Sequence, residues 1–393
     1  MIKLRISTLV ATTALVLAAC GGTGTAATPS VSLPTSVGEG EGALTVLAWP
    51  GYAEDGSTQP DVDWVQPFEK ATGCQVDVTS FNTSDEAYQL FTSGSGATYD
   101  VISASGDASL RLVAGGNVQP VNTDLVPNYA DIFPSLKDKP WNTVNGVHYG
   151  IPHGRGANLL MWNTTLVKPD PDSWGAVFDE NSPYKGKVTA YDAPIYIADA
   201  AVYLMATQPD LKITNPYALD QAQFDASVAL LKKQRPAIGA YWSTYTQEIE
   251  AFTNGNSVLG TAWQINANLL QAQDPPAPVK VIKPKEGATG WSDTWMINSK
   301  TKHLNCAYKW LNDIVSPKVN AQVAEWFGEA PANQKSCDLT ADKNHCTIFE
   351  AAETDFWKNV YYWTTPTKAC LDGRGDICVG FDKWIQAWTE IKG

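Results

Sequence analysis

The sequence predicts an α/β protein built from two lobes. Apolar, strand-like segments alternate at short intervals with helical segments, which is typical of a lobe folded around a mostly parallel sheet. The chain that follows an N-terminal leader and linker, residues 44–393, is longer than one hydrophobic core usually serves. Two lobes with separate cores account for both observations.

The N-terminus predicts an export signal. Lys3 and Arg5 give a basic start, an apolar run follows over residues 9–19, and small residues stand directly before Cys20. This order is that of a secretory signal peptide, and the run is shorter than the ~20 residues of a membrane-spanning helix. Small residues before a cysteine resemble the lipobox of bacterial lipoproteins, so we expect residues 1–19 to be removed and Cys20 to be acylated. Ordinary secretion, with Cys20 a chance thiol, is the alternative.

Residues 20–43 predict a flexible, lipid-anchored tether. They are mostly small and polar and contain few large apolar side chains. Such a segment cannot bury enough apolar surface to fold. It would hold the folded part of the protein away from the membrane.

The first lobe begins with three strand–helix units. The first strand ends at Pro50 and Gly51, and the first helix ends at Gly73, because proline and glycine interrupt regular structure. Either Thr83 or Ser84 caps the second helix. The predicted strands cover residues 43–49, 74–79 and 98–103, and the helices 63–72, 84–91 and 108–114.

Further strands and helices follow from residue 148 onward. The strands are apolar and end in loops marked by proline, glycine or asparagine, and the helices have apolar residues at helical spacing. The predicted strands cover residues 148–152, 157–162, 187–191 and 258–263, and the helices 198–205, 224–232, 245–252, 305–315 and 319–327.

Six cysteines besides Cys20 predict three disulfide bonds. An even number of cysteines is typical of a disulfide framework in an exported protein, and six cysteines allow 15 connectivities. Two pairs would close short loops, and the third would then join distant segments: Cys337–Cys346, Cys370–Cys378 and Cys74–Cys306. A metal site is less favoured because no Cys-x-x-Cys or histidine-rich pairing accompanies these cysteines.

The formal net charge of −13 argues against a nucleic-acid partner, since phosphates require basic patches. It fits a cationic ligand, and it also fits simple solubility. We expect neither a cofactor nor a metal.

Aromatic and acidic residues gather at the ends of the predicted strands, where open α/β sheets bind their ligands. Aromatic faces attract organic cations by roughly 0.5–2 kcal/mol each, and a carboxylate binds an ammonium through a charge-assisted hydrogen bond. A slot with such walls would suit an elongated amine. The alternative is that each tryptophan is core packing and each aspartate a helix cap. The candidates are Trp49, Tyr52, Asp192, Trp263, Trp291 and Asp293.

The order and wording of nine segments resemble the spermidine/putrescine-binding proteins of ABC importers, a branch of the extracellular solute-binding families. The resemblance covers residues 44–393 and implies a type II periplasmic-binding-protein fold, in which two α/β lobes close on a solute in the cleft between them. It implies that lobe one is 44–157 plus 293–335 and lobe two 158–292 plus 336–393. The segments are LTVLAWPGYAEDG, VQPFEKATGCQV, ATYDVISAS, GGNVQPVN, HYGIP, PYKGKV, LGTAWQ, PKEGATGWSDTWMINS and WIQAWTEIKG.

The same resemblance implies that the six candidates line the ligand, with Asp293 as the partner of an ammonium group. A late tryptophan of the family corresponds loosely to Trp363. The chain departs from the family at several positions. Asp107, preceded by a glycine, and Glu329 stand where the family carries aromatic residues, and both become candidate ligand residues.

Two further departures bear on the identity of the ligand. Ile195 replaces an expected second carboxylate, which favours a shorter diamine over spermidine. Arg155, at the predicted crossing between the lobes, would suit the carboxylate or phosphonate of a zwitterion. An interlobe salt bridge explains Arg155 equally well.

The function implied is that of a receptor, not an enzyme. It would act as a monomer, in the periplasm or at the outer face of the cytoplasmic membrane. It would capture a small cationic solute, a polyamine, by lobe closure and deliver it to an ABC permease and its ATPase. The same role for another amine-bearing solute or a sugar is the alternative.

Two other classes of protein fit the sequence less well. An exported hydrolase is remote because the sequence has neither a Gly-x-Ser-x-Gly elbow nor a His-Glu-x-x-His motif, although a glycosidase carboxylate pair would leave no such motif. A surface adhesion protein is suggested by the Arg-Gly-Asp triplet at 374–376. That triplet lies in a turn-rich loop, where chance is the better explanation.

Overall fold

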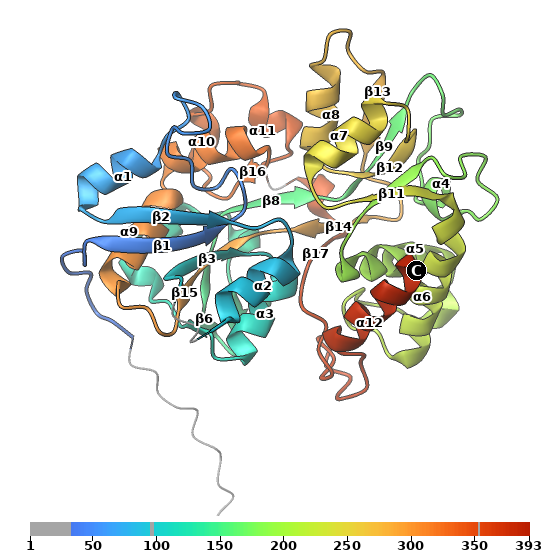
Figure 1. The fold of residues 1–393 in the computed structure, drawn as a ribbon. Coiled ribbons are helices and arrows are strands. Elements are labelled where there is room, and N and C mark those ends of the chain that lie inside the picture. The colour runs from blue at the N-terminus through green and yellow to red at the C-terminus, as the bar shows by residue number, and fades with distance from the viewer. Residues whose placement is uncertain (1–32, 95–97, 353) are drawn as a thin grey trace, which may run out of the picture. The chain divides into compact units, whose positions relative to one another are not determined.

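The computed structural model describes residues 33–94, 98–352 and 354–393, and within these ranges three β-sheets have four or more strands (Figure 1). The predicted signal peptide and Cys20 lie outside the described residues. From Leu33 onward the chain forms one compact unit. Among the described helices, none has both the length and the apolar character that a membrane span requires.

The first sheet has the strand order β2-β1-β3-β15-β4, and β7 also pairs with β15. β1 is parallel to β2 and β3, whereas β15 enters from a distant part of the chain and runs antiparallel to its neighbours. Its strands are β1 (Ala43–Ala48), β2 (Gln75–Ser80), β3 (Val101–Ala104), β4 (Val118–Gln119), β7 (Gly150–Pro152) and β15 (Thr294–Asn298). The helices of this lobe are α1 (Val65–Thr72), α2 (Ser84–Thr92), α3 (Gly106–Ala114), α9 (Leu304–Ile314) and α10 (Pro317–Phe327).

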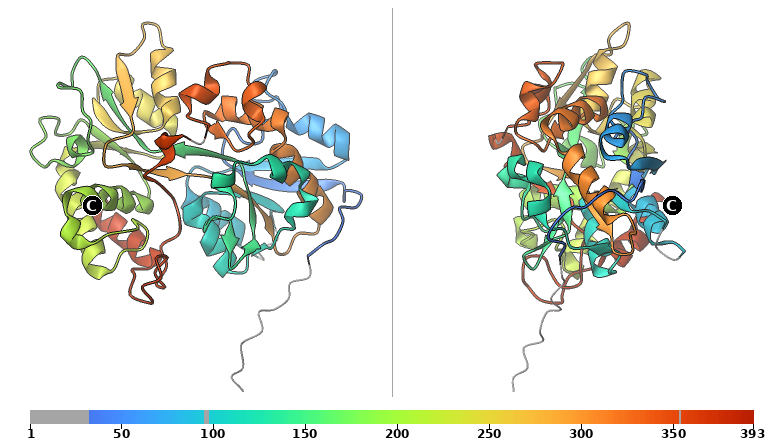
Figure 2. Two further views of the ribbon diagram at one scale, coloured as in Figure 1. Left: turned by 180° about the vertical axis from the view of Figure 1, so that it is seen from behind. Right: turned by 90° about the vertical axis from the view of Figure 1, so that its left-hand side faces the viewer.

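The second sheet has the order β11-β10-β12-β9-β13. β10 is parallel to β11 and β12, and β9 is antiparallel to β12 and β13. Its strands are β9 (Leu159–Asn163), β10 (Val188–Tyr191), β11 (Ile238–Trp242), β12 (Leu259–Ala262) and β13 (Val279–Ile282). Its helices are α4 (Gly175–Phe178), α5 (Ile197–Thr207), α6 (Gln221–Gln234), α7 (Tyr245–Thr253), α8 (Gln264–Gln271) and α12 (Phe381–Lys392), and α12 packs with α6 and beside α5 (Figures 1 and 2).

A third sheet, with the order β16-β8-β14-β17, contains the strands that connect the other two. β8 lies between β7 and β9 in the chain, and β14 lies between β13 and β15, so the chain crosses between the lobes along both strands. Its strands are β8 (Gly154–Ala157), β14 (Ala288–Trp291), β16 (Ala330–Pro331) and β17 (Val360–Tyr362). The two-lobed α/β fold class predicted from the sequence is confirmed.

Shorter elements complete the described chain. A hairpin joins β5 (Thr143–Val144) to β6 (Val147–His148), and α11 (His345–Ile348) follows β16. The 3-10 helices are Thr123–Leu125, Pro127–Asp131, Pro134–Leu136, Pro194–Tyr196, Pro209–Leu211, Arg235–Ala237, Ser336–Asp338 and Asp355–Trp357.

Each lobe has its own apolar core. In the first, Phe68 of α1 meets Trp310 of α9 edge to face, with ring centroids 5.2 Å apart. In the second, Phe224 of α6 meets Trp384 of α12 at 5.8 Å. Each of these buried aromatic pairs joins helices far apart in the chain, so each stabilises its lobe by removing large apolar side chains from water.

Local sequence signals set several boundaries as predicted. Thr83 is the N-cap of α2, because its Oγ1 accepts a hydrogen bond of 3.1 Å from the Glu86 N–H; Ser84 is the first residue of the helix. Gly73 ends α1 in the left-handed conformation, at φ 73°, which glycine adopts without steric cost. The helix α12 was not predicted, although its buried residues recur at helical spacing. Very short strands such as β16 and β17 carry too little periodicity to be found in the sequence.

The described end of the predicted tether is bound to lobe one. The Gly38 N–H donates to Asn305 Oδ1 at 2.7 Å, and Glu41 Oε2 accepts from the Cys306 N–H at 2.9 Å in the first turn of α9. The flexible tether predicted for residues 20–43 therefore does not extend to residue 43.

The segment after residue 335, predicted to belong to lobe two, first continues along lobe one. The Ser336 hydroxyl donates to the Pro317 carbonyl at 2.8 Å, and the Asp342 N–H donates to Glu325 Oε1 at 2.7 Å. Both acceptors belong to α10, so this segment stays with lobe one before the chain reaches α12 in lobe two.

The three predicted disulfide bonds are confirmed, and among the connectivities that the sequence left open the structure has the two short loops and the one long-range bond. Cys337–Cys346 and Cys370–Cys378 span 9 and 8 positions, whereas Cys74–Cys306 spans 232. The long-range bond joins the start of β2 to α9. It therefore links two parts of lobe one that the sequence separates by all five strands of the second sheet.

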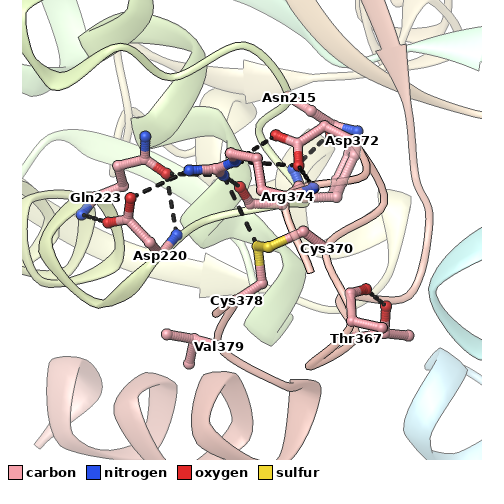
Figure 3. The surroundings of a disulfide bond; sticks show 12 residues. Asn215, Asp220, Gln223, Thr367, Cys370, Asp372, Arg374, Cys378 and Val379 are labelled. Atoms are coloured by element: carbon pink, nitrogen blue, oxygen red, sulfur yellow. Dashed lines mark hydrogen bonds and ion pairs between the residues drawn. A yellow bond between two sulfur atoms is a disulfide. The ribbon is translucent and has the colours of Figure 1, made fainter. Parts of the chain in front are cut away.

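The loop closed by Cys370–Cys378 is held to lobe two by Arg374 (Figure 3). The Arg374 guanidinium donates to Asp372 Oδ2 at 2.8 Å and to Asp220 Oδ2 at 3.1 Å, and its Nη2 also donates to the carbonyl of Ala218. The arginine of the Arg-Gly-Asp triplet thus has a structural role, which agrees with the interpretation that the triplet is a chance match.

Candidate functional site

Two buried carboxyl groups meet at one phenol. Tyr52 Oη lies 2.9 Å from Asp293 Oδ2 and 2.9 Å from Glu329 Oε2, and all three side chains are buried. A phenol has only one hydrogen to donate. It can satisfy one ionised carboxylate, so the other must carry a proton or receive a hydrogen bond from another donor.

Three separate segments bring these groups together. Tyr52 follows β1 in lobe one, Asp293 stands between the crossing strand β14 and β15, and Glu329 stands between α10 and β16. Because the three segments meet where the chain passes between the lobes, a molecule held here would contact both the first sheet and the crossing strands.

The carboxyl group of Asp293 has a pKa close to neutral pH, so a nearby charge can change its ionisation. Its Oδ1 accepts a hydrogen bond of 2.5 Å from the Ser105 hydroxyl, at the end of β3. Burial raises the pKa of Asp293 to about 6, although hydrogen bonds from Ser105 and Tyr52 act in the opposite direction. A cation placed beside this carboxyl would shift it to the ionised form.

Glu329 is more strongly biased toward its neutral form. Burial raises its pKa well above the usual value, and the charge of Asp293 raises it further. Its Oε1 has no hydrogen-bond partner among the described residues. Gly154 of β8 allows this carboxyl to lie against the crossing strand, since a Cβ at that position would be 2.2 Å from the Glu329 carboxyl carbon.

His153 faces Glu329 as a neutral imidazole. Burial lowers the pKa of His153 to about 3. Its Nδ1 accepts a hydrogen bond of 2.9 Å from Trp295 Nε1, so the ring hydrogen is on Nε2. Nε2 is 3.5 Å from Glu329 Oε1 and, within the described chain, has no hydrogen-bond partner. The nearest imidazole therefore supplies no positive charge to the acidic pair.

Asp107, at the start of α3, is a third buried acid, and it is close enough for the charge of Asp293 to act on it. Its Oδ1 accepts from the Ser84 hydroxyl at 2.9 Å. Burial raises the pKa of Asp107 to about 7, and the charges of Asp85 and Asp293 contribute in the same direction. In the described part of the chain, no lysine or arginine forms an ion pair with Asp107, Asp293 or Glu329; the nearby Arg111 pairs with Asp85.

A continuous row of aromatic rings leads from lobe two to the acidic pair. The Trp263 and Trp291 centroids are 6.3 Å apart, Trp291 and Phe327 are 5.8 Å apart, and Phe327 and Tyr52 are 4.3 Å apart. Gly156 of β8 makes room for this row, since a Cβ there would be 2.4 Å from the Trp291 ring. The structure thus brings together Tyr52, Trp263, Trp291, Asp293 and Glu329.

Trp49 and Trp363 each pack on an aromatic ring outside this row. The Trp49 ring packs on Phe81 at 4.5 Å, and the Trp49 N–H donates to the Ser103 hydroxyl on β3 at 3.1 Å. The Trp363 ring lies 5.6 Å from Tyr191. Both indole Nε1 atoms are buried and, among the residues described, have no acceptor.

The structure gives Asp192 a different partner from the one predicted. Its Oδ1 accepts from Trp388 Nε1 at 2.8 Å and from Lys392 Nζ at 2.6 Å, and both donors belong to α12. Because these two donors already satisfy it, this carboxylate anchors the C-terminal helix, and the structure does not bring it to the acidic pair.

The Arg155 guanidinium, like the Asp192 carboxylate, is engaged by groups of the protein itself. Its Nη2 donates to the Ala351 carbonyl at 2.8 Å, its Nη1 donates to the Ser135 hydroxyl at 3.0 Å, and its guanidinium lies 4.1 Å from the centre of the Trp357 ring. Arg155 is buried, and its contacts hold the segment after α11 in place.

The candidate site is closed in this structure. Its acidic side chains are buried, and two surface hollows of about 460 and 370 Å³ are lined by other residues. The sequence predicts a slot, but here its walls touch one another. A solute can reach these carboxylates only if the lobes separate.

Several residues of this site were missed in the sequence. Ser105 stands two residues after the predicted strand 98–103 and directly after the observed β3, so the strand-end argument could have found it. His153 directly follows the predicted strand 148–152, so the same argument could have found it. Phe327 carried no such signal, because its position beside Tyr52 depends on how α10 packs.

Comparisons with known proteins show which family the chain belongs to. A sequence profile of the family described as bacterial extracellular solute-binding protein matches residues 63–348. The spermidine/putrescine-binding periplasmic protein of Escherichia coli is 24% identical over 324 residues, which cover 80% of this chain and 89% of that protein. The putrescine-binding periplasmic protein PotF of the same species is 24% identical over 333 residues, covering 79% and 83%.

A solved structure shows the same fold. The spermidine/putrescine ABC transporter substrate-binding protein of Streptococcus pneumoniae superposes with a TM-score of 0.67 at 18% identity, covering 89% of this chain and 99% of that one. These matches confirm the resemblance noted in the sequence. They also confirm that the chain is not an enzyme, because the family consists of solute-binding proteins. The chain belongs to the bacterial extracellular solute-binding proteins.

Proposed function

We propose that this protein is the solute receptor of an ABC importer and that its solute is a polyamine, with a short diamine favoured. The observation that carries the proposal is the buried Asp293–Tyr52–Glu329 group, which has more acceptors than donors. An ammonium has three N–H donors and a positive charge, so it supplies what this group lacks. The names of the relatives point to the same class of solute.

The proposed mechanism is capture by closure. In the open form, one ammonium of the ligand approaches Asp293 and Glu329, and its alkyl chain lies along the faces of Trp291 and Trp263. Closure removes water, and the attraction between the ammonium and the carboxylates strengthens as the local dielectric constant falls. The ligand then shifts the population toward the closed form, since it contacts both lobes only there.

The proposal includes the location of the receptor. The protein would be located in the periplasm or at the outer face of the cytoplasmic membrane, anchored by acylation of Cys20. The residues after Cys20 would form a linker between the anchor and the folded part. As a monomer, the protein would deliver the solute to a membrane permease driven by an ATPase. Mass spectrometry of the membrane-extracted protein tests the anchor, because acylation adds a lipid mass to a chain that begins at Cys20.

One observation favours a polyamine over a zwitterion. A zwitterion would need a cationic group for its acidic end, and Arg155 was the candidate. Its guanidinium is instead engaged by Ser135 and by the carbonyls of the segment after α11. The acidic pair therefore has no adjacent anion site built from Arg155.

A thermal-shift screen followed by calorimetry tests the proposed solute class. Putrescine, agmatine and spermidine should raise the melting temperature; at a ligand concentration of 100 Kd the stabilisation is about 2.7 kcal/mol. Neutral amino acids, aminoethylphosphonate and sugars should have no effect. Stabilisation by a sugar or by an amino acid, with none from the amines, would overturn the proposed solute class.

Amine affinity is expected to fall as the pH is lowered from 8 to 5. The raised pKa of Asp293, about 6, and that of Glu329 mean that the ligand-free site binds protons that a bound ammonium must displace. Each displaced proton lowers the binding constant by up to about tenfold per pH unit below the pKa. Calorimetry at pH 6, in two buffers with different ionisation enthalpies, should detect the released proton. An affinity that is constant from pH 5.5 to 8 would contradict this coupling.

Raising the pH should strengthen amine binding, but it should lower the folding stability of the ligand-free protein. Because the folded-state pKa of Asp293 lies above its ordinary value of 3.8, the ligand-free fold gains stability from this group at low pH. That contribution is lost as the pH rises through about 6. The melting temperature of the ligand-free protein, measured across this window in parallel, serves as the control for the binding data.

A further inference from the structure

A chain of side-chain hydrogen bonds connects the indole of Trp263 to a buried carboxyl group. Trp263 Nε1 donates to Asn158 Oδ1 at 2.9 Å, and Asn158 Nδ2 donates to Thr289 Oγ1 at 2.7 Å. The Thr289 hydroxyl donates to Asp199 Oδ1 at 2.9 Å, and the other oxygen of Asp199 accepts from the Tyr191 hydroxyl. The indole and amide nitrogens can only donate, so the direction of the first two bonds is determined.

The relay connects three parts of the fold. Trp263 stands between β12 and α8 in lobe two, and Asp199 is in the first turn of α5. Asn158 and Thr289 belong to the crossing: Asn158 stands between β8 and β9, and Thr289 lies in β14. The Asn158 N–H also donates to the Thr289 carbonyl at 2.9 Å, so the same two residues are paired through both backbone and side chain.

Apolar contacts alone do not hold the Trp263 ring in one orientation. Its ring meets Trp242 edge to face at 4.9 Å and Trp291 at 6.3 Å, and Trp263 is only partly buried. Such contacts are short-ranged but weakly directional. The single N–H donor of the indole points to one acceptor, and that acceptor is oriented in turn by Thr289. Asn158, Thr289 and Asp199 are all buried, so water does not compete with these bonds.

We infer that Asn158 and Thr289 are positioning residues for ligand binding: they hold the Trp263 indole in place and tie it to the crossing strands. The inference rests on the proposed function for the role of Trp263 at the amine slot. The relay itself does not depend on it. Without the relay the Trp263 indole can rotate. The ring then spends less time in the orientation that contacts the ligand, so the ligand dissociates faster.

A matched pair of variants tests this role. Thr289→Val keeps the shape of the side chain and removes the hydroxyl, whereas Thr289→Ser keeps the hydroxyl. The first readout is the indole N–H resonance of Trp263 in ¹⁵N-tryptophan-labelled protein without ligand, assigned by its absence in Trp263→Phe. The second is the affinity and dissociation rate of putrescine.

We expect T289V to shift the Trp263 indole resonance and to weaken putrescine binding about tenfold, mainly through faster dissociation, while T289S preserves both. An unshifted resonance in T289V, or a shifted resonance with unchanged putrescine affinity, would overturn the positioning role. Asn158→Ala removes the acceptor directly and gives the same test if T289V does not fold. If the parent protein binds no amine, the proposed function fails, and the resonance still decides whether the relay holds Trp263.

Discussion

Replacing Asp293 by asparagine is expected to weaken putrescine binding about 100-fold or more. Asparagine has nearly the same shape and still accepts a hydrogen bond from Ser105, so the change removes a charge and little else. An ammonium enclosed in the closed site then loses an ionised partner without regaining water. Removing one partner of a desolvated charge pair typically costs about 2–5 kcal/mol, and 100-fold corresponds to about 2.7 kcal/mol.

The matched control is Asp192→Asn. The sequence and the family resemblance give Asp192 the same role as Asp293, but the structure pairs it with Lys392 and Trp388 of α12. We expect Asp192→Asn to lower the melting temperature slightly and to leave putrescine affinity within about twofold. Calorimetry on both variants separates the two carboxylates. If D192N weakens binding as much as D293N, the anchoring role of Asp192 is wrong.

The ligand-free stability of D293N provides an internal check. Burial raises the pKa of Asp293, so its ionised form is costly in the absence of a cation. The neutral asparagine avoids this cost at neutral pH, so D293N should melt no lower than the parent protein. Weak binding in a variant of undiminished stability would place the loss in the site and not in the fold.

Removing the Cys74–Cys306 bond is expected to be the most destabilising change. This bond spans 232 positions, and the chain-entropy argument assigns a loop of that length about 5 kcal/mol. Both cysteines are fully buried in the core of lobe one, so loss of the bond also leaves a packing defect there. Urea denaturation of the Cys74→Ala/Cys306→Ala variant measures the effect through the unfolding midpoint at a fixed slope.

The matched control is the Cys370→Ala/Cys378→Ala variant. Its loop spans 8 positions, for which the same argument gives about 2.5 kcal/mol. The Arg374 contacts also keep this loop attached when the bond is absent. We therefore expect the smaller loss of unfolding free energy. Equal losses in the two variants would show that loop length does not determine the contribution of these bonds.

Much of this protein could be predicted from the sequence because its signals are local. The strand–helix order of lobe one, the cap at Thr83 and the end of α1 at Gly73 depend on residues within one turn of each other. The even number of cysteines predicted three disulfide bonds, whereas their connectivity stayed open until the structure showed it. The motif order was sufficient to recognise the family, and Tyr52, Asp293 and Glu329 were all among the candidate residues.

The roles of these residues were decided only by tertiary structure. Spacing along the chain cannot show that Glu329 meets Tyr52 or that Asp192 meets Lys392, because both contacts depend on how remote segments pack. Periodicity also cannot separate a core tryptophan such as Trp310 from Trp291 beside the acidic pair, since both are buried aromatic rings. The physical reason is that hydrophobic burial is non-directional, whereas a charge or hydrogen-bond donor acts only on the group placed next to it.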